Sequence, residues 1–508
     1  MMKKTNGKPT APLLSLLHNW VSLAGSILAA SSLFTVAFLI ALDFFRGFKN
    51  PYMGILTYIV APAFLIAGLC VIAIGALWER HRRRRLMPGA IPPFPRIDLN
   101  VPRQRHVFIT VSVLTVVFLL MTAVGSYRTY QFSESVIFCG KTCHSVMTPE
   151  YTTYQVSPHA RVQCVQCHIG PGVSWFVKSK LSGAYQVYAT LMDTYPRPIP
   201  TPIKNLRPAR DTCEQYHWPQ KFFGKIERNF THYLPDEDNS LWTIRMLVKI
   251  GGGDSNFGET GGIHWHMAIA NKIEYIASDH ERQVIPWVRL TDRNGKVTVY
   301  QSTDNPLKPK VIAAAHPRVM DCIDCHNRPT HIYHAPVDSV DTAMRSGRIG
   351  HDLPYIKKEA VLALTQNYPN TAQAFSGISK ILTKFYETNY PDRAKTNSQS
   401  VAAAVMEVQN IYRHNFFPSM KVDWRVYPDN LGHMNSSGCY RCHDGNHTSA
   451  DGKTIVHDCD TCHTIILQGP EGKEETGLAG LKFKHPVDIS AQWKEINCAD
   501  CHDGSLAE

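Results

Sequence analysis

Pairs of cysteines that are separated by two residues and followed at once by histidine occur at five places in the sequence. Two thiols at this spacing can add across the two vinyl groups of a haem, and the next imidazole then reaches the iron as an axial ligand. Zinc sites also use paired cysteines, but zinc does not need a histidine directly after each pair. The repeated motif therefore indicates covalently attached haem c. The five copies are Cys164/Cys167/His168, Cys322/Cys325/His326, Cys439/Cys442/His443, Cys459/Cys462/His463 and Cys498/Cys501/His502.

A longer version of the motif precedes these copies. Cys139 and Cys143 have three residues between them, and His144 follows directly. A flexible Gly-Lys pair in this loop could absorb the extra residue, so we expect a haem here. Met147 follows His144 at i+3 and could compete with it for the iron, although methionine is ordinarily a packing residue. A thioether ligand would raise the reduction potential of this haem.

A second variant lies between the first two intact copies. Cys213 and His217 keep the first thiol and the imidazole, but Tyr216 stands where the second cysteine should be. A lost haem would leave Cys213 as a free thiol, which is a liability in an oxidising compartment. We favour a haem held by one thioether. The sequence thus predicts seven haem sites, numbered one to seven in chain order, of which site three depends on Cys213 and His217.

Histidines outside the motifs are candidates for the sixth ligand of each iron. Several lie a few residues before or after a motif, and the run Ile263–His266 on an alternating strand would point two imidazoles to one side. A single histidine is as often a surface or core residue as a ligand, but the set is large enough to serve every site. The candidates are His159, His264, His266, His316, His331, His433, His447, His457 and His485.

The amino-terminal part of the chain has three long apolar runs. Residues 18–45, 54–78 and 107–127 can each cross roughly 30 Å of hydrocarbon. The loop at 79–106 is rich in arginine, which predicts a cytoplasmic loop, a cytoplasmic N-terminus and a periplasmic remainder. The net charge of +11 comes from this basic part, so it indicates lipid headgroups rather than nucleic acid. We expect an anchor in the bacterial inner membrane.

The fold class predicted is mainly α with little regular structure: transmembrane helices followed by a haem-cored cytochrome c domain with a small β-rich insertion. So many haem sites leave little room for an ordinary apolar core. Residues 355–418 have helical apolar spacing and no motif, which predicts connecting helices. The expected divisions are a membrane domain at 1–128, haem sites one to three at 129–218, the β-rich insertion at 219–315 and sites four to seven at 316–508.

Part of the chain resembles a known family. The segments 138–150, 157–161, 164–172 and 175–178 are similar to the NapC/NirT/NrfH family of membrane-anchored quinol dehydrogenases, over roughly residues 130–220. The resemblance implies menaquinol oxidation near the first haem and electron delivery to periplasmic c-type cytochromes, in anaerobic or extracellular respiration. The sequence departs from the family pattern in the longer first motif, in the position of Met147 and at Tyr216.

The quinol site has four candidate residues. Within the family, a lysine on the helix after the second haem lies near the quinol, and Lys178 or Lys180 matches it approximately. Residues 172–192 mix aromatic side chains with lysine, as a helix at a membrane interface would, although a solvated helix face has a similar composition. Quinol oxidation releases two protons, so Glu134 and Glu150 are further candidates.

Two other functions fit the motifs. A terminal reductase of a small nitrogen or sulfur oxyanion needs one haem with an open position, often signalled by lysine in place of the motif histidine, and no C-x-x-C-K occurs. A passive electron wire would need the haems but neither lysine. We take the leading hypothesis to be a quinol:cytochrome c oxidoreductase.

Overall fold

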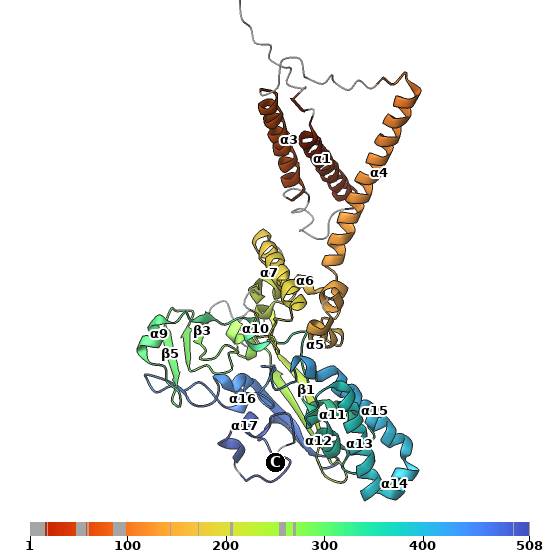
Figure 1. The fold of residues 1–508 in the computed structure, drawn as a ribbon. Coiled ribbons are helices and arrows are strands. Elements are labelled where there is room, and N and C mark those ends of the chain that lie inside the picture. The colour runs from red at the N-terminus through yellow and green to blue at the C-terminus, as the bar shows by residue number, and fades with distance from the viewer. Residues whose placement is uncertain are drawn as a thin grey trace, which may run out of the picture. The chain divides into compact units, whose positions relative to one another are not determined.

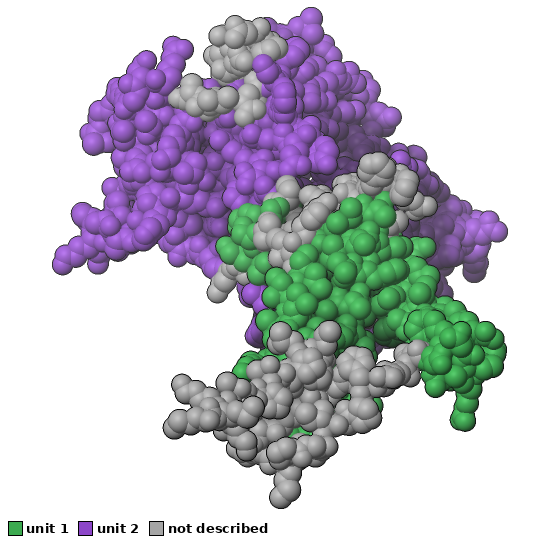
Figure 2. Space-filling model, turned by 90° about the horizontal axis from the view of Figure 1, so that it is seen from above, with its two compact units in different colours: residues 1–138, 169–180 green, residues 139–168, 181–508 purple. Residues whose placement is uncertain are grey.

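A computed structural model of the chain divides into two compact units, which Figure 2 shows in different colours. The membrane unit is Met1–Phe138 with Ile169–Lys180, and the haem unit is Cys139–His168 with Leu181–Glu508. Each unit is described by itself. The described residues are 16–17, 19–46, 57, 60–84, 98–142, 144–170, 172–203, 207–252, 261–267, 271–490 and 492–506.

The membrane unit contains three helices that are long and apolar enough to cross a membrane, which confirms the three predicted spans. They are α1 (Trp20–Arg46), α3 (Ala61–Arg84) and α4 (Pro102–Ser133) (Figure 1). Helix α4 starts with a proline in its first turn, where no backbone N–H is needed. Residues 85–97 of the arginine-rich loop that predicted the orientation lie outside the described residues.

Helices α1 and α3 pack with their backbones in close contact. A Cβ atom at Gly68 would lie 2.7 Å from the backbone nitrogen of Ala29, so only glycine fits there. Asn19 donates a hydrogen bond to the carbonyl of Gly75 (3.1 Å), and Ser22 donates one to the carbonyl of Ile72 (3.2 Å). Small residues and buried polar bonds are the usual means of holding helices together in lipid.

The haem unit has a helical part with an apolar core of its own. Helices α11 (Pro336–Arg345), α12 (Ile356–Thr365), α13 (Thr371–Asn389) and α15 (Ser398–Asn415) lie side by side, with the short helix α14 (Pro391–Thr396) between the last two in sequence (Figure 1). Their fully buried side chains include Val340, Val361, Leu364, Ile378 and Leu382. The predicted connecting helices at 355–418 are therefore a packing core that supports the haem sites.

Two antiparallel sheets join the region 219–315 to the last haem motifs. The first sheet has the order β1-β2-β8-β9 and the second has the order β6-β3-β4-β5-β7. Strand β8 begins at the motif residue His463, and β7 follows site five directly. The β-rich region is thus tied to sites five and six. The strands are β1 (Lys225–Tyr233), β2 (Leu241–Lys249), β3 (Lys272–Ile276), β4 (Trp287–Thr291), β5 (Val297–Ser302), β6 (Arg318–Val319), β7 (His447–Ser449), β8 (His463–Pro470) and β9 (Glu475–Leu481).

A buried ion pair fastens the first sheet to the helical core. The ammonium of Lys357 on α12 donates to Asp341 Oδ1 on α11 at 2.6 Å, and both side chains are buried. Asp341 also accepts from the backbone N–H of Tyr233 (3.1 Å) and lies 3.3 Å from Nδ1 of His232, both on β1. The Asp341 carboxylate therefore joins its own helix α11 to both α12 and β1.

We expect Lys357→Met to destabilise the haem unit by about 3–5 kcal/mol, because it leaves the buried Asp341 carboxylate without its cation. The neighbouring Lys358 is exposed, so Lys358→Met is the matched control. Thermal unfolding of the two variants measures the difference. Equal midpoints would show that the pair contributes nothing to stability.

Candidate functional site

The intact motifs fold as single helical turns. Cys164–His168 (α6), Cys322–Cys325 (α10), Cys459–Cys462 (α16) and Cys498–Cys501 (α17) are α-helical, and Gly438–Arg441 at site five is a 3₁₀ turn. In this turn the histidine N–H donates to the carbonyl of the first cysteine, for example at 2.8 Å in sites four and seven. The turn holds the two thiols and the imidazole on one side of the backbone, as attachment to one haem requires.

Site three keeps this local fold although it lacks one thiol. Cys213 ends helix α8 (Ala209–Cys213), and the N–H of His217 donates to the carbonyl of Cys213 at 2.8 Å, as in the intact copies. The Tyr216 side chain is 72% exposed, so its ring is not part of an apolar core among the described residues. The backbone geometry at site three therefore fits a haem held by one thioether.

Site one accommodates its extra residue by widening the helix. Residues Phe138–Thr142 form a π-helix, in which each turn holds about one residue more than in an α-helix. Gly140 is needed here because a Cβ atom would collide with the ring of Tyr151. Cys143 lies outside the described residues, as does the side chain of His144. Met147 packs against the apolar core of the haem unit.

From site two onward, each motif histidine faces one histidine from outside the motifs. An iron bound by two imidazoles, at about 2 Å from each ligating nitrogen, places the two ring centres roughly 6 Å apart. The donor set and the spacing therefore fit a haem with two axial histidines at six sites. The pairs and their ring-centroid distances are His168 and His331 (6.4 Å), His217 and His159 (6.0 Å), His326 and His264 (6.4 Å), His443 and His266 (5.7 Å), His463 and His433 (6.2 Å), and His502 and His485 (6.0 Å).

Hydrogen bonds fix which nitrogen of most partner histidines can bind iron. A backbone carbonyl can only accept, so a ring Nδ1 that bonds to one must carry the proton, and Nε2 keeps its lone pair for a metal. The five partners with this bond, each followed by its carbonyl and distance, are His331 (Glu150, 2.9 Å), His159 (Pro329, 3.1 Å), His264 (Ile250, 2.9 Å), His266 (Ile263, 2.8 Å) and His485 (Val487, 2.8 Å). At His485 the N–H of Val487 also lies 3.3 Å from Nδ1, and the shorter contact with the carbonyl decides the assignment.

His264 and His266 reach different sites because they do not lie on a strand. The expected alternating strand was wrong: Ile263–Met267 is a 3₁₀ helix. In such a helix, residues two apart point in widely different directions. His264 therefore faces His326 at site four, and His266 faces His443 at site five. One short turn thus supplies a ligand candidate to each of two neighbouring sites.

Three candidate histidines are not brought to a motif histidine among the described residues. Both ring nitrogens of His447 are used by the protein, with Nδ1 2.8 Å from Asp444 Oδ1 and Nε2 2.7 Å from the carbonyl of Ile285. Burial would lower the pKa of His447, but these bonds outweigh burial and raise it. His447 is thus a structural cation. His316 is exposed, and His457 packs against Tyr440 with 4.9 Å between ring centroids.

The thiols of the first four sites lie close together. A hydrogen bond from the thiol of Cys139 lowers the pKa of Cys164 to about 7. Burial, and then the charge of Cys213, raise the pKa of Cys167. A hydrogen bond from Cys322 lowers the pKa of Cys213. Sites one to four therefore follow one another in space in the order in which they occur in the chain.

Sites five to seven continue this order. Burial, and then the charge of Cys439 at site five, raise the pKa of Cys462 at site six. Burial, and then the charge of Cys459 at site six, raise the pKa of Cys498 at site seven. Each of the seven sites thus lies next to the site that follows it in the chain.

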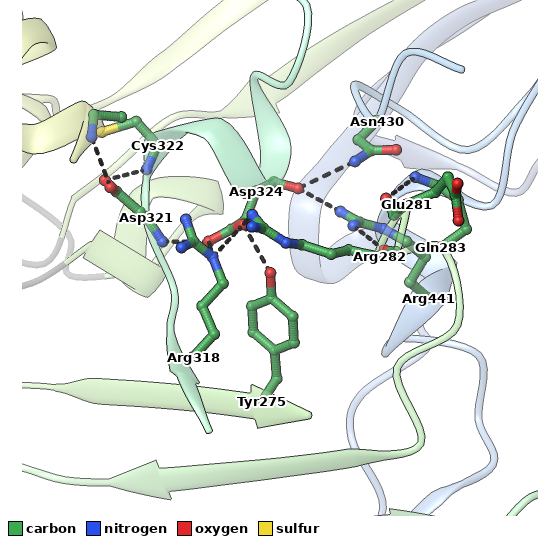
Figure 3. A network of polar contacts seen from close by, with 11 residues as sticks. Tyr275, Glu281, Arg282, Gln283, Arg318, Asp321, Cys322, Asp324, Asn430 and Arg441 are labelled. Carbon is green, nitrogen blue, oxygen red and sulfur yellow. Dashed lines mark hydrogen bonds and ion pairs between the residues drawn. The ribbon is translucent and has the colours of Figure 1, made fainter. Parts of the chain in front are cut away.

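A buried carboxylate joins sites four and five, as Figure 3 shows. Asp324 Oδ1, inside the site-four motif, accepts hydrogen bonds from the hydroxyl of Tyr275 (2.7 Å) and from the guanidinium groups of Arg318 (2.9 Å) and Arg282 (3.2 Å). Arg441, inside the site-five motif, donates to the backbone carbonyl of Asp324 at 2.6 Å. The two motifs are therefore locked together. Sequence reasoning missed this role, although charged residues inside two C-x-x-C loops were the available signal.

The membrane unit brings two of the four quinol-site candidates together. Lys180 Nζ donates to Glu134 Oε1 at 2.6 Å; the Glu134 side chain is 5% exposed, whereas that of Lys180 is 40% exposed. Lys178 is exposed and lies over the ring of Trp175, 4.8 Å from its centroid. Glu150 lies in the haem unit, where burial raises the pKa of its carboxyl group.

These features define a class of protein. The chain has several haem-attachment motifs, each with a second histidine facing the motif histidine, and three candidate membrane helices. This combination is typical of a membrane-anchored multihaem c-type cytochrome that transfers electrons.

Comparison with known proteins gives the family. Residues 101–199 match the model of the NapC/NirT cytochrome c family, N-terminal region. The chain is 46% identical over 486 residues to the cytochrome c-type protein ImcH of Geobacter sulfurreducens, and these aligned residues cover 96% of this chain and 95% of ImcH. No solved structure gives a significant match. The chain belongs to the NapC/NirT cytochrome c family.

The histidine pairs predict the spin state of single variants. Replacing His331 by alanine should leave one haem with five ligands, so one haem equivalent should become high-spin in the electron paramagnetic resonance (EPR) spectrum of the oxidised protein. His316→Ala, at an exposed position, is the control and should leave the spectrum unchanged. A high-spin signal from His316→Ala, or none from His331→Ala, would contradict the pairing.

Proposed function

We propose that this protein oxidises menaquinol at the periplasmic face of the bacterial inner membrane and passes the electrons through seven haems c to periplasmic c-type cytochromes. The observation that carries this proposal is the set of six histidine pairs in one row. A haem iron accepts and gives up one electron at a time. Six sites with two imidazoles each leave no described site with an open position, which favours electron transfer over a terminal reductase.

The Lys180–Glu134 pair is the best candidate for the quinol site. Menaquinol must lose two protons and two electrons to become menaquinone. The Glu134 carboxylate is an acceptor for a proton from one quinol hydroxyl, and the partly exposed Lys180 ammonium is a donor to the quinol oxygen. The Glu134 carboxylate accepts one proton, releases it to water and then accepts the second, and the two electrons go one at a time to the haem row. The pair combines a buried base with an accessible cation, as this reaction needs.

The protein supports these steps in different ways. The five Nδ1 bonds to backbone carbonyls hold the partner imidazoles in one orientation, so that Nε2 faces the iron without rearrangement. The Asp324 network holds sites four and five in contact. Fixed ligands and fixed spacing keep the row continuous from the first site to the last.

The quinol site is tested with a carboxylate variant. Glu134→Gln removes the proton acceptor, so the rate of reduction by a menaquinol analogue should fall about 100-fold. Lys180→Ala should also lower the rate, and Lys178→Ala should lower it less, because Lys178 lies on a ring rather than on a carboxylate. The haem spectrum must stay unchanged in all three. Wild-type rates for both Glu134→Gln and Lys180→Ala would indicate a wire without this quinone site.

The seventh haem is tested by mass. The intact protein should carry seven covalent haems, and Cys213→Ala should carry one fewer because Cys213 supplies the only thiol of site three. Tyr216→Ala, at an exposed position without a thiol, is the control and should keep seven. Six haems in the wild-type protein would mean that Cys213 is not used.

A further inference from the structure

Hydrogen bonds to the axial histidines are distributed unevenly along the row of haem sites. Sites two, three, four and seven each have at least one axial imidazole whose Nδ1 donates to a backbone carbonyl. At site five both imidazoles do so: His266 to Ile263 (2.8 Å) and His443 to Val456 (2.7 Å). At site six neither does.

The site-six imidazoles are half-buried and lack the carbonyl bond found at the other sites. Nδ1 of His433 and Nδ1 of His463 are both covered by protein atoms, and neither donates to a carbonyl group of another residue. The ring of Tyr440, from the site-five motif, stacks on His433 with 4.3 Å between centroids and 17° between planes. Stacking thus orients His433 where a hydrogen bond orients the other partners.

This difference has a direct effect on the iron. Donation from Nδ1–H to a carbonyl makes the imidazole a stronger base, which stabilises ferric iron and lowers the reduction potential. Two such bonds at site five therefore favour a low potential, and their absence at site six favours a high one.

Charged groups lie near both sites. Arg441 and Asp444 act on Cys442 at site five, where the charge of His447 also acts on His443. Lys249 and Asp460 act on His463 at site six, where Asp458 and Asp460 act on Cys459. These charges alone would favour the higher potential at site five, so the proposed order requires the hydrogen bonds to have the larger effect.

We propose that sites five and six form a one-way step, in which the haem held by His463 and His433 has a higher reduction potential than its neighbour held by His443 and His266. Electrons that reach site five from the membrane side then move downhill to site six. The step rests on the proposed haem ligation and gives the proposed function its direction, toward the C-terminal sites. It does not depend on which molecule reduces the first haem.

The test is a mediated redox titration followed by EPR, without any quinol. His433→Met and His266→Met each replace one imidazole by a thioether, which changes the low-spin signal of one haem and so assigns sites six and five. The site-six signal should be lost at a higher potential than the site-five signal in the wild-type protein. The reverse order would overturn the proposal, and so would a His433→Met spectrum identical to wild type.

A second pair of variants tests the cause. Tyr440→Ala removes the ring that stacks on His433 and leaves its imidazole free to turn until Nδ1 meets water, so the potential of site six should shift down toward that of site five. Tyr440→Phe keeps the stacked ring and should keep the potential. Equal potentials in the two variants would show that the missing hydrogen bond is not the cause. Loss of quinol oxidation in a Glu134 variant leaves these potentials unchanged, so the two proposals fail separately.

Discussion

Each iron in this account needs two imidazoles, and only one of them comes from its own motif. At most sites the second comes from a distant part of the chain, whereas at site seven His485 lies shortly before the motif, so the ligand pairs close loops of very different lengths. The pair of His168 and His331 joins site two to the segment that follows site four. The pair of His217 and His159 joins site three to the segment that precedes site two. The fold of the haem unit is organised around these closures.

The same requirement explains the β-rich region between sites three and four. Its short 3₁₀ turn carries His264 and His266, and its strands pair with β7 and β8, which follow sites five and six. The sheets hold the turn against the motifs that it serves. The buried Asp324 and Lys357 ion pairs then fasten the sheets to the motifs and to the helical core. The haem sites are therefore held in place both by their ligand pairs and by contact with a helical core of ordinary apolar side chains.

Local chemistry made much of the site predictable from the sequence. The three apolar spans and the small sheets of the β-rich region were predicted and are confirmed, and the haem-attachment motifs stay predictions that the helical turns at these positions support. The choice of partner histidine was not predictable, because it depends on which remote segments meet. His447, like His433, lies only a few residues from the site-five motif. Its two ring nitrogens are nevertheless hydrogen-bonded to Asp444 and to the carbonyl of Ile285, so it does not face a motif histidine. In the same way, only the fold shows that Lys180, and not Lys178, reaches Glu134. The strand predicted at His264 was wrong because two histidines at alternate positions can also lie on a tight 3₁₀ turn.

Electron cryomicroscopy of the haem-loaded protein would test the central claim most directly. The account predicts seven haems in one unbranched row in sequence order, with six irons each between a motif histidine and the partner assigned to it by ring distance. A branched row, or any of these six irons with a different distal ligand or an open position, would contradict it.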